Sequence, residues 1–254
     1  MQGFAQSPSP RGLFDGVLLV DKPAGPTSHD VVHQIRKTFR IEKAGHGGTL
    51  DPNATGLLLI LLGKGTKLSG QLMGSDKAYT GVMRLGRVTN TQDCDGEILE
   101  EKPFDGVTRG QVQAQMDALS GDIFQTPPMV SAIKLNGVPL YKLARKGQEV
   151  EREPRFVHIY RFAVTDWAPP LVAFEVRCTK GTYVRTLAHD VGQALGCGAC
   201  LDALRRTQSG AFDVKDALPF TEVLKLTPEA LAARVIPFAR LAARAPLPAA
   251  PRTA

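Results

Sequence analysis

One carboxylate in a short glycine-rich segment is the group best placed to do chemistry in this sequence. Asp51 lies within residues 43–56, KAGHGGTLDPNATG, where three glycines come before it and Pro52 comes directly after it. Glycine lets the backbone bend and lets a ligand approach closely, and functional side chains are concentrated on such loops. A plain connector in which Asp-Pro begins a turn has the same composition. The segment therefore makes Asp51 a candidate, and local evidence leaves both interpretations open.

Three other motifs predict no chemistry. Residues 63–66, GKGT, lack the glycine that a phosphate-binding P-loop requires five positions before its Gly-Lys pair. Cys197 and Cys200 form a single CxxC without a second one, so we interpret them as buried small residues and expect no metal. His29 and His33 have helical i, i+4 spacing, but no Glu follows His29 as a zinc protease motif requires. We expect these two histidines to lie on a solvated helix face.

Buried strands and a helix are predicted around the Asp51 segment. Residues 14–20, FDGVLLV, are typical of a buried strand, and the Pro-Thr-Ser run at 26–28 is a start signal for a helix. Residues 57–62 are typical of a second buried strand, and residues 77–85 of a third that carries Tyr79.

Strands and helices continue along the chain without strict alternation. A capping box at Thr108 and Gln111 predicts a helix, and Asn136-Gly137 between apolar runs predicts a hairpin. Further strands are expected over 156–164 and 171–178, and further helices over 184–195 and from Thr227. Strands outnumber helices, which indicates an α+β fold with a mainly antiparallel or mixed sheet rather than a doubly wound one.

The composition is that of an ordinary folded protein with a basic charge balance. Of the 254 residues, 43% are hydrophobic and 22% are charged, which excludes general disorder and fibrous repeats. The formal net charge of +6 favours a polyanionic partner such as nucleic acid. The longest apolar run, residues 57–62, is much shorter than the roughly 20 residues that cross a membrane. Four scattered cysteines suit a reducing compartment, and residues 1–12 contain no apolar signal region, so we expect a cytoplasmic protein.

Four segments occur in an order and at a spacing that point to one family. They are residues 21–30 (DKPAGPTSHD), the Asp51 segment, residues 77–86 (KAYTGVMRLG) and residues 178–196 (CTKGTYVRTLAHDVGQALG). Together they closely resemble the TruB family of tRNA pseudouridine synthases, over residues 14–210. The resemblance implies the pseudouridine synthase fold and the isomerisation of uridine 55 in the T loop of tRNA, with no cofactor.

The resemblance implies three catalytic residues. Asp51 is the essential carboxylate that attacks a flipped-out uridine, at either the ribose C1′ or the base C6. Arg185 is the cation that keeps Asp51 ionised in a desolvated site, whereas pattern alone would make it an exposed helix arginine. Tyr79 is the aromatic platform under the flipped base, although a strand tyrosine is more often part of a core.

Further positions are implied to contact substrate. His46, Tyr183 and Leu204 match positions that line the T loop or the uracil, although Leu204 also fits an ordinary core. Lys22, in the DKPAG segment, fits a structural role as well as a catalytic one. Asp93 lies in TNTQDCDG, where the family usually has TDTxDxxG and Asn90 replaces the first Asp.

The insertion at residues 125–155 resembles the RNA-gripping subdomain of the bacterial stand-alone members. Residues 134–161 contain seven positive and three negative side chains, and Lys142, Arg145 and Lys146 are expected to contact phosphates, although a solvated charged loop is the alternative.

We expect residues 1–12 to be a flexible tail and residues 13–215 to be the catalytic domain. Residues 216–254 are expected to be a short helical extension with a disordered end, without the RNA-binding barrel common in TruB proteins. The expected partner is the T stem-loop of tRNA, with no guide RNA, no membrane and a monomeric enzyme. A non-catalytic RNA-binding or tRNA-folding protein is the alternative function, and a zinc enzyme based on Cys197 and Cys200 is a third.

Overall fold

The computed structural model describes residues 12–131, 133–135, 137–144, 147–148 and 150–242. The chain divides into two compact units. The first consists of the residues up to Ser75 and those from Arg206 onward, and the second of Asp76–Arg205. Of the predicted flexible ends, residues 1–11 of the tail at 1–12 and all of residues 244–254 lie outside the described residues.

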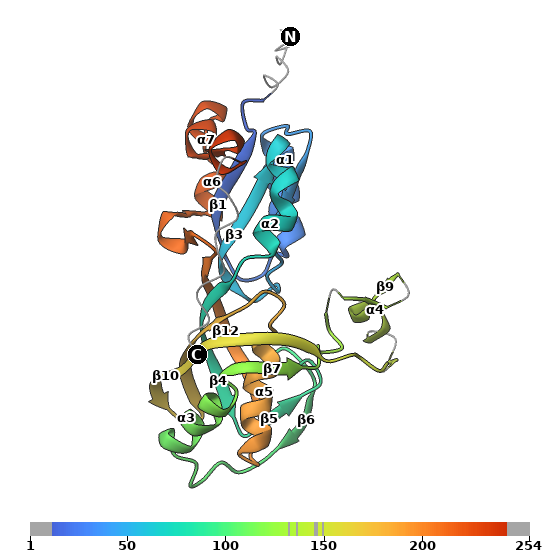
Figure 1. Cartoon of the computed structure of the whole chain (residues 1–254), viewed down its shortest axis with the longest axis vertical. Helices are drawn as coiled ribbons and strands as arrows, with labels where there is room; N and C mark the ends of the chain where they lie inside the picture. The colour runs from blue at the N-terminus through green and yellow to red at the C-terminus, as the bar shows by residue number, and fades with distance from the viewer. Residues whose placement is uncertain (1–11, 132, 136, 145–146, 149, 243–254) are drawn as a thin grey trace, which may run out of the picture. The chain divides into compact units, whose positions relative to one another are not determined.

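The first unit is built on two strands that are buried on both faces. β1 (Gly16–Lys22) pairs antiparallel with β3 (Thr55–Leu62), and the two lie side by side in Figure 1. Every residue of β3 from Gly56 onward is buried, which explains why the sequence there is continuously apolar instead of alternating. Flanking strands are β2 (Ala44–His46) on β3, and β14 (Leu218–Pro219) and β15 (Ile236–Pro237) on β1.

Helix α1 (Ser28–Thr38) begins where the sequence predicts. Thr27 caps it and forms a capping box with Asp30. Val31, Val32 and Ile35 are buried, whereas His29 and His33 are exposed, as expected for a solvated face. The remaining elements of this unit are η1 (Gly63–Leu68), α2 (Ser69–Met73), β13 (Phe212–Asp213), η2 (Val214–Asp216), α6 (Phe220–Val223), α7 (Pro228–Arg234) and α8 (Phe238–Ala242).

The second unit is an antiparallel sheet covered by two helices. Its strands run in the order β4 (Lys77–Leu85), β11 (Leu171–Cys178), β10 (Arg155–Ala168) and β7 (Gly121–Gln125). Helix α3 (Arg109–Ala118) packs against β10 and against α5 (Val184–Ala194), with Met83, Phe174 and Val191 in the shared core. A separate hairpin joins β5 (Arg87–Thr89) to β6 (Ile98–Glu101), and β12 (Ala199–Ser209) continues from this unit into the first.

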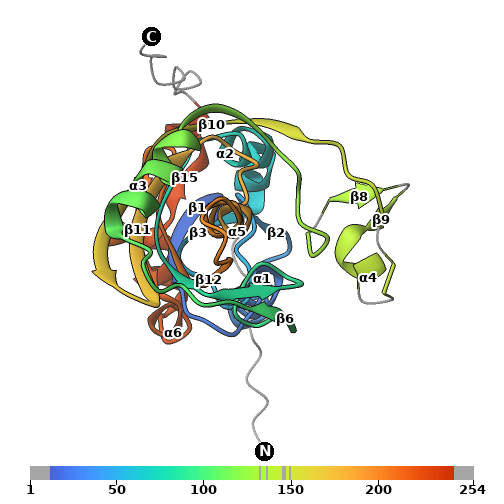
Figure 2. The same ribbon diagram turned by 90° about the horizontal axis from the view of Figure 1, so that it is seen from below.

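The insertion forms a small group of its own within the second unit. The predicted hairpin is confirmed as β8 (Lys134–Leu135) and β9 (Val138–Pro139), and α4 (Leu140–Ala144) follows it. Figure 2 shows β8, β9 and α4 gathered in one place, and in the chain they lie between β7 and β10. The α+β class with a mainly antiparallel mixed sheet is also confirmed. No helix in the described ranges is long and apolar enough to cross a membrane.

Candidate active site

The first unit presents Asp51 on the loop between β2 and β3. Asp51 is exposed, while Leu50 and Ala54 on either side are buried. The backbone N–H of Ala54 donates to the carbonyl of Asp51 at 3.1 Å, and buried Ser28 binds both polar groups of Leu50, accepting from its N–H at 2.8 Å and donating to its carbonyl at 3.0 Å. Asp51 is therefore an exposed residue on a backbone that hydrogen bonds hold in place.

Lys22 lies beneath the same loop. Its buried ammonium donates to the carbonyls of Pro23, Pro26 and Pro52 at 2.7–2.8 Å. Burial lowers the pKa of Lys22 to about 8, and the charge of Asp51 acts to raise it. Both the contact with Pro52 and this interaction place Lys22 beside the candidate nucleophile. The structure thus brings Lys22 and Asp51 together.

His46 ends β2, opposite Ile60 of β3. Its Nδ1 is buried and has no hydrogen-bond partner within the described ranges. Burial lowers the pKa of His46, and the positive charge of Arg206 and the nearby His29 lower it further. The imidazole is therefore neutral at physiological pH and can both donate and accept a hydrogen bond.

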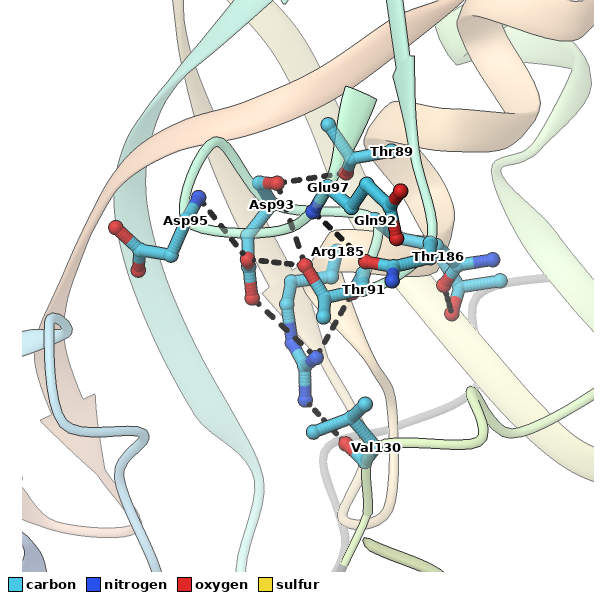
Figure 3. Close-up of polar contacts among 10 residues, drawn as sticks. Thr89, Thr91, Gln92, Asp93, Asp95, Glu97, Val130, Arg185 and Thr186 are labelled. Atoms are coloured by element: carbon cyan, nitrogen blue, oxygen red, sulfur yellow. Dashed lines mark hydrogen bonds and ion pairs between the residues drawn. The ribbon is translucent and has the colours of Figure 1, made fainter. Parts of the chain in front are cut away.

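In the second unit, Arg185 is buried in the first turn of α5 (Figure 3). It donates to the carbonyls of Thr91 and Val130 at 2.9 and 2.8 Å, and its guanidinium lies 3.4 Å from the carboxylate of Asp93. The interpretation of Arg185 as an exposed helix arginine is therefore wrong. A buried guanidinium with these acceptors has a fixed direction.

The loop that carries Asp93 is ordered by its own side chains (Figure 3). Thr91 donates to the Asp93 carboxylate at 2.5 Å, and Thr89 donates to the Asp93 carbonyl at 2.6 Å. Asn90, at the position where the sequence departs from the family pattern, accepts from the backbone N–H of Glu97 at 3.0 Å. Asn90 therefore takes part in closing this loop.

Tyr183 is the N-cap of α5 and is fixed by Gln125 at the end of β7. The Gln125 side chain donates to the Tyr183 carbonyl at 3.1 Å and accepts from its N–H at 2.7 Å. Tyr79 on β4 and Leu204 on β12 are partly buried and pack against the core of the second unit. In the insertion, Lys142 lies in α4, while Arg145 and Lys146 lie outside the described residues.

No group of three or more metal-ligating side chains occurs among the residues that the structure describes. Cys197 and Cys200 are buried, as the interpretation as small core residues predicts.

Two family models match adjacent parts of the chain. The N-terminal domain of the TruB family pseudouridylate synthases matches residues 36–184, and the tRNA pseudouridylate synthase B C-terminal domain matches residues 185–241. The chain belongs to the TruB family. The border between the two matches falls at the start of α5, next to Arg185.

Curated TruB relatives are similar over most of their length. The chain is 53% identical to the tRNA pseudouridine synthase B of Opitutus terrae over 228 residues, which is 90% of this chain and 95% of that protein. It is 47% identical to the enzyme of the same name from Endomicrobium trichonymphae, over 82% of this chain and 91% of that protein.

Two solved structures have folds similar to that of this chain. A chain from a Cbf5–Nop10–Gar1 complex is 31% identical with a TM-score of 0.70, covering 89% of this chain and 61% of that one. A chain from an H/ACA RNP bound to a substrate RNA containing 2′-deoxyuridine is 28% identical with a TM-score of 0.67, covering 91% and 62%.

Sequence reasoning missed several side chains that position the TruB motifs. Arg206 follows the predicted contact Leu204 and is buried, although an arginine on a strand would ordinarily be exposed. Gln125 and Ser28 gave no signal for their contacts with Tyr183 and Leu50, because a lone glutamine or serine has no distinctive spacing. Only three-dimensional contacts identify them.

Proposed function

We propose that this chain converts uridine 55 in the T loop of tRNA to pseudouridine, with Asp51 as the nucleophile. In this reaction the bond between N1 and C1′ of the uridine breaks and a bond between C5 and C1′ forms. The proton on C5 is lost and N1 gains one, so no other group is consumed. We further propose that the enzyme is monomeric and acts in the cytoplasm without a cofactor.

The observation that carries this proposal is the Asp51 loop itself. A carboxylate that attacks C1′ or C6 must meet the carbon in a fixed direction, because effective nucleophilic catalysis depends on a near-attack geometry. Asp51 is exposed, and Ser28 and Lys22 bind the backbone of the residues on either side of it, which supports this requirement. The names of the relatives point to the same reaction.

The residues of the second unit supply the other proposed roles. Arg185 keeps Asp51 ionised when RNA excludes water, since a nearby cation opposes the effect of desolvation on a carboxyl pKa. Tyr79 stacks on the flipped base and returns about 1–3 kcal/mol of the stacking lost on extrusion. Asp93, Tyr183, Leu204 and the insertion position the RNA.

We propose that the enzyme reads its tRNA directly and needs no guide RNA. Identity to the curated proteins named tRNA pseudouridine synthase B is 46–53%, against 28–31% for the chains from the Cbf5 and H/ACA structures. The higher identity supports a stand-alone enzyme.

The test is pseudouridine mapping on unmodified tRNA incubated with the purified protein alone. We expect modification at position 55, none in a tRNA with cytidine at that position, and none with Asp51→Asn. Since Asp51→Asn is nearly isosteric, it should leave tRNA affinity close to that of the wild type. Binding without any pseudouridine would favour the non-catalytic alternative, and modification only with an added guide RNA would refute stand-alone action.

The ion-pair role of Arg185 has a separate test. Arg185→Met should be nearly inactive at neutral pH through the ionisation of Asp51. Full activity of Arg185→Met at neutral pH would refute that role while leaving the proposed reaction in place.

A further inference from the structure

Arg206 of β12 is a buried cation that binds the backbone on both sides of the Asp51 loop. Its side chain donates to the carbonyl of Leu57 at 2.7 Å, to that of Thr49 at 3.3 Å and to that of Gly48 at 3.1 Å. The residue is 1% exposed. One guanidinium thus joins the two ends of the segment from Gly48 to Leu57.

The chemistry of the guanidinium suits this arrangement. Its five N–H donors form a planar fork in fixed directions, so one side chain can satisfy several carbonyls that face it from different parts of the chain. A lysine ammonium is a point charge on a flexible stem and cannot reproduce the same fork. The identity of the residue therefore sets the spacing between the two ends of the loop.

Backbone carbonyls surround the positive charge of Arg206. Its contacts in the described part of the chain are these backbone carbonyls, and no carboxylate lies within ion-pair distance. Burying a cation without an acidic partner is costly. An apolar side chain of similar size would avoid this cost, which suggests that Arg206 serves geometry rather than stability.

We propose that Arg206 is a positioning residue for the isomerisation, which sets the place of the Asp51 carboxylate by fixing Gly48, Thr49 and Leu57. This inference rests on the proposed function for its kinetic consequence. Three side chains thus donate to backbone carbonyls close to Asp51 in the sequence. Arg206 donates to Thr49, Ser28 to Leu50 and Lys22 to Pro52.

The kinetic test compares three variants. Arg206→Met removes all three hydrogen bonds, and Arg206→Lys keeps the charge with fewer donors. Leu231→Ala removes a fully buried side chain from α7 and serves as a control for lost stability. Because a displacement of about 1 Å can cost roughly 100-fold in rate, we expect kcat of Arg206→Met to fall about 100-fold with KM for tRNA nearly unchanged. Arg206→Lys should recover part of the loss.

A second measurement does not depend on the reaction. Amide hydrogen exchange over residues 48–57 should accelerate in Arg206→Met and not in Leu231→Ala, both measured on the full chain below their unfolding temperatures. If wild type makes no pseudouridine, the proposed function fails, and the exchange experiment still tests the contact of Arg206 with the loop.

Three outcomes would overturn the proposal. The first is normal kcat in a folded Arg206→Met protein, whatever its exchange rates. The second is a loss of kcat that Leu231→Ala matches at equal loss of melting temperature, because this would show that Arg206 contributes only to stability. The third is unaltered exchange over residues 48–57, which would refute the fixing of the loop.

Discussion

Gly56→Ala should disrupt the approach of β12 to the start of β3. Gly56 has φ of +98°, and a Cβ there would lie 2.3 Å from the Arg206 carbonyl oxygen and 2.8 Å from its nitrogen. Backbone atoms cannot move aside as a side chain can. Overpacking costs about 1–3 kcal/mol and a side chain at positive φ about 1–3 kcal/mol, so the free energy of unfolding should fall by about 2–6 kcal/mol. For a chain of this size the melting temperature should drop by at least about 4 °C.

Two matched variants separate the contributions in a thermal unfolding assay. Gly106→Ala has a similar φ of +85° but open space around its Cβ, so it should show only the backbone strain. Gly70→Ala, in α2, has neither a positive φ nor a neighbour within 4 Å and should not destabilise the protein. If Gly56→Ala and Gly106→Ala lose the same stability, the close approach of Arg206 to Gly56 is refuted.

Three further changes test the charge and stacking arguments. The pKa of Lys22 is lowered from 10.5 to about 8, so between these pH values the folded state binds fewer protons than the unfolded state. The free energy of unfolding, measured by denaturant titration, should therefore rise with pH across that window in the wild type relative to Lys22→Met. A stability difference that does not change with pH would contradict this pKa argument. Activity, in contrast, should fall above pH 8, since a neutral amine donates two hydrogen bonds and not three. Tyr79→Phe should keep tRNA affinity and Tyr79→Ala should lose it in a filter-binding assay, whereas equal losses would indicate a hydroxyl contact. Replacing Lys142, Arg145 and Lys146 with Ala should flatten the slope of log affinity against log salt by roughly one unit per lost phosphate contact, and an unchanged slope would place the grip on RNA elsewhere.

The fold was largely predictable because its signals are local. The Pro-Thr-Ser run at 26–28 predicted the start of α1, which begins at Ser28, and the Asn-Gly pair at 136–137 predicted the hairpin β8–β9. The division into two units was not predictable, because β12 is a single strand whose residues before and after Arg206 belong to different units. Nothing in a continuous strand marks such a border.

The candidate site was predictable only in part. The resemblance to the TruB motifs makes Asp51 and Arg185 candidates, but it does not say which groups hold them in place. Arg206, Ser28 and Gln125 act through backbone carbonyls and amides of residues distant in the sequence. Backbone carbonyls and amides are almost the same for every residue type, so the sequence cannot show which of them a side chain contacts. Only the structure reveals these contacts.

The guanidinium of Arg185 donates to the carbonyl of Val130, which lies inside the insertion (Figure 3). Gln125, at the base of the insertion, forms two hydrogen bonds with the backbone of Tyr183. RNA binding by the insertion and the placement of the Arg185 guanidinium, which is proposed to serve catalysis, are therefore energetically coupled. Linkage is reciprocal: if RNA binding favours one placement of residues 125–130, then that placement of Arg185 favours RNA binding by the same free energy. An RNA that does not contact the insertion therefore leaves Arg185 less well placed. Such an RNA should have a lower kcat as well as a lower affinity.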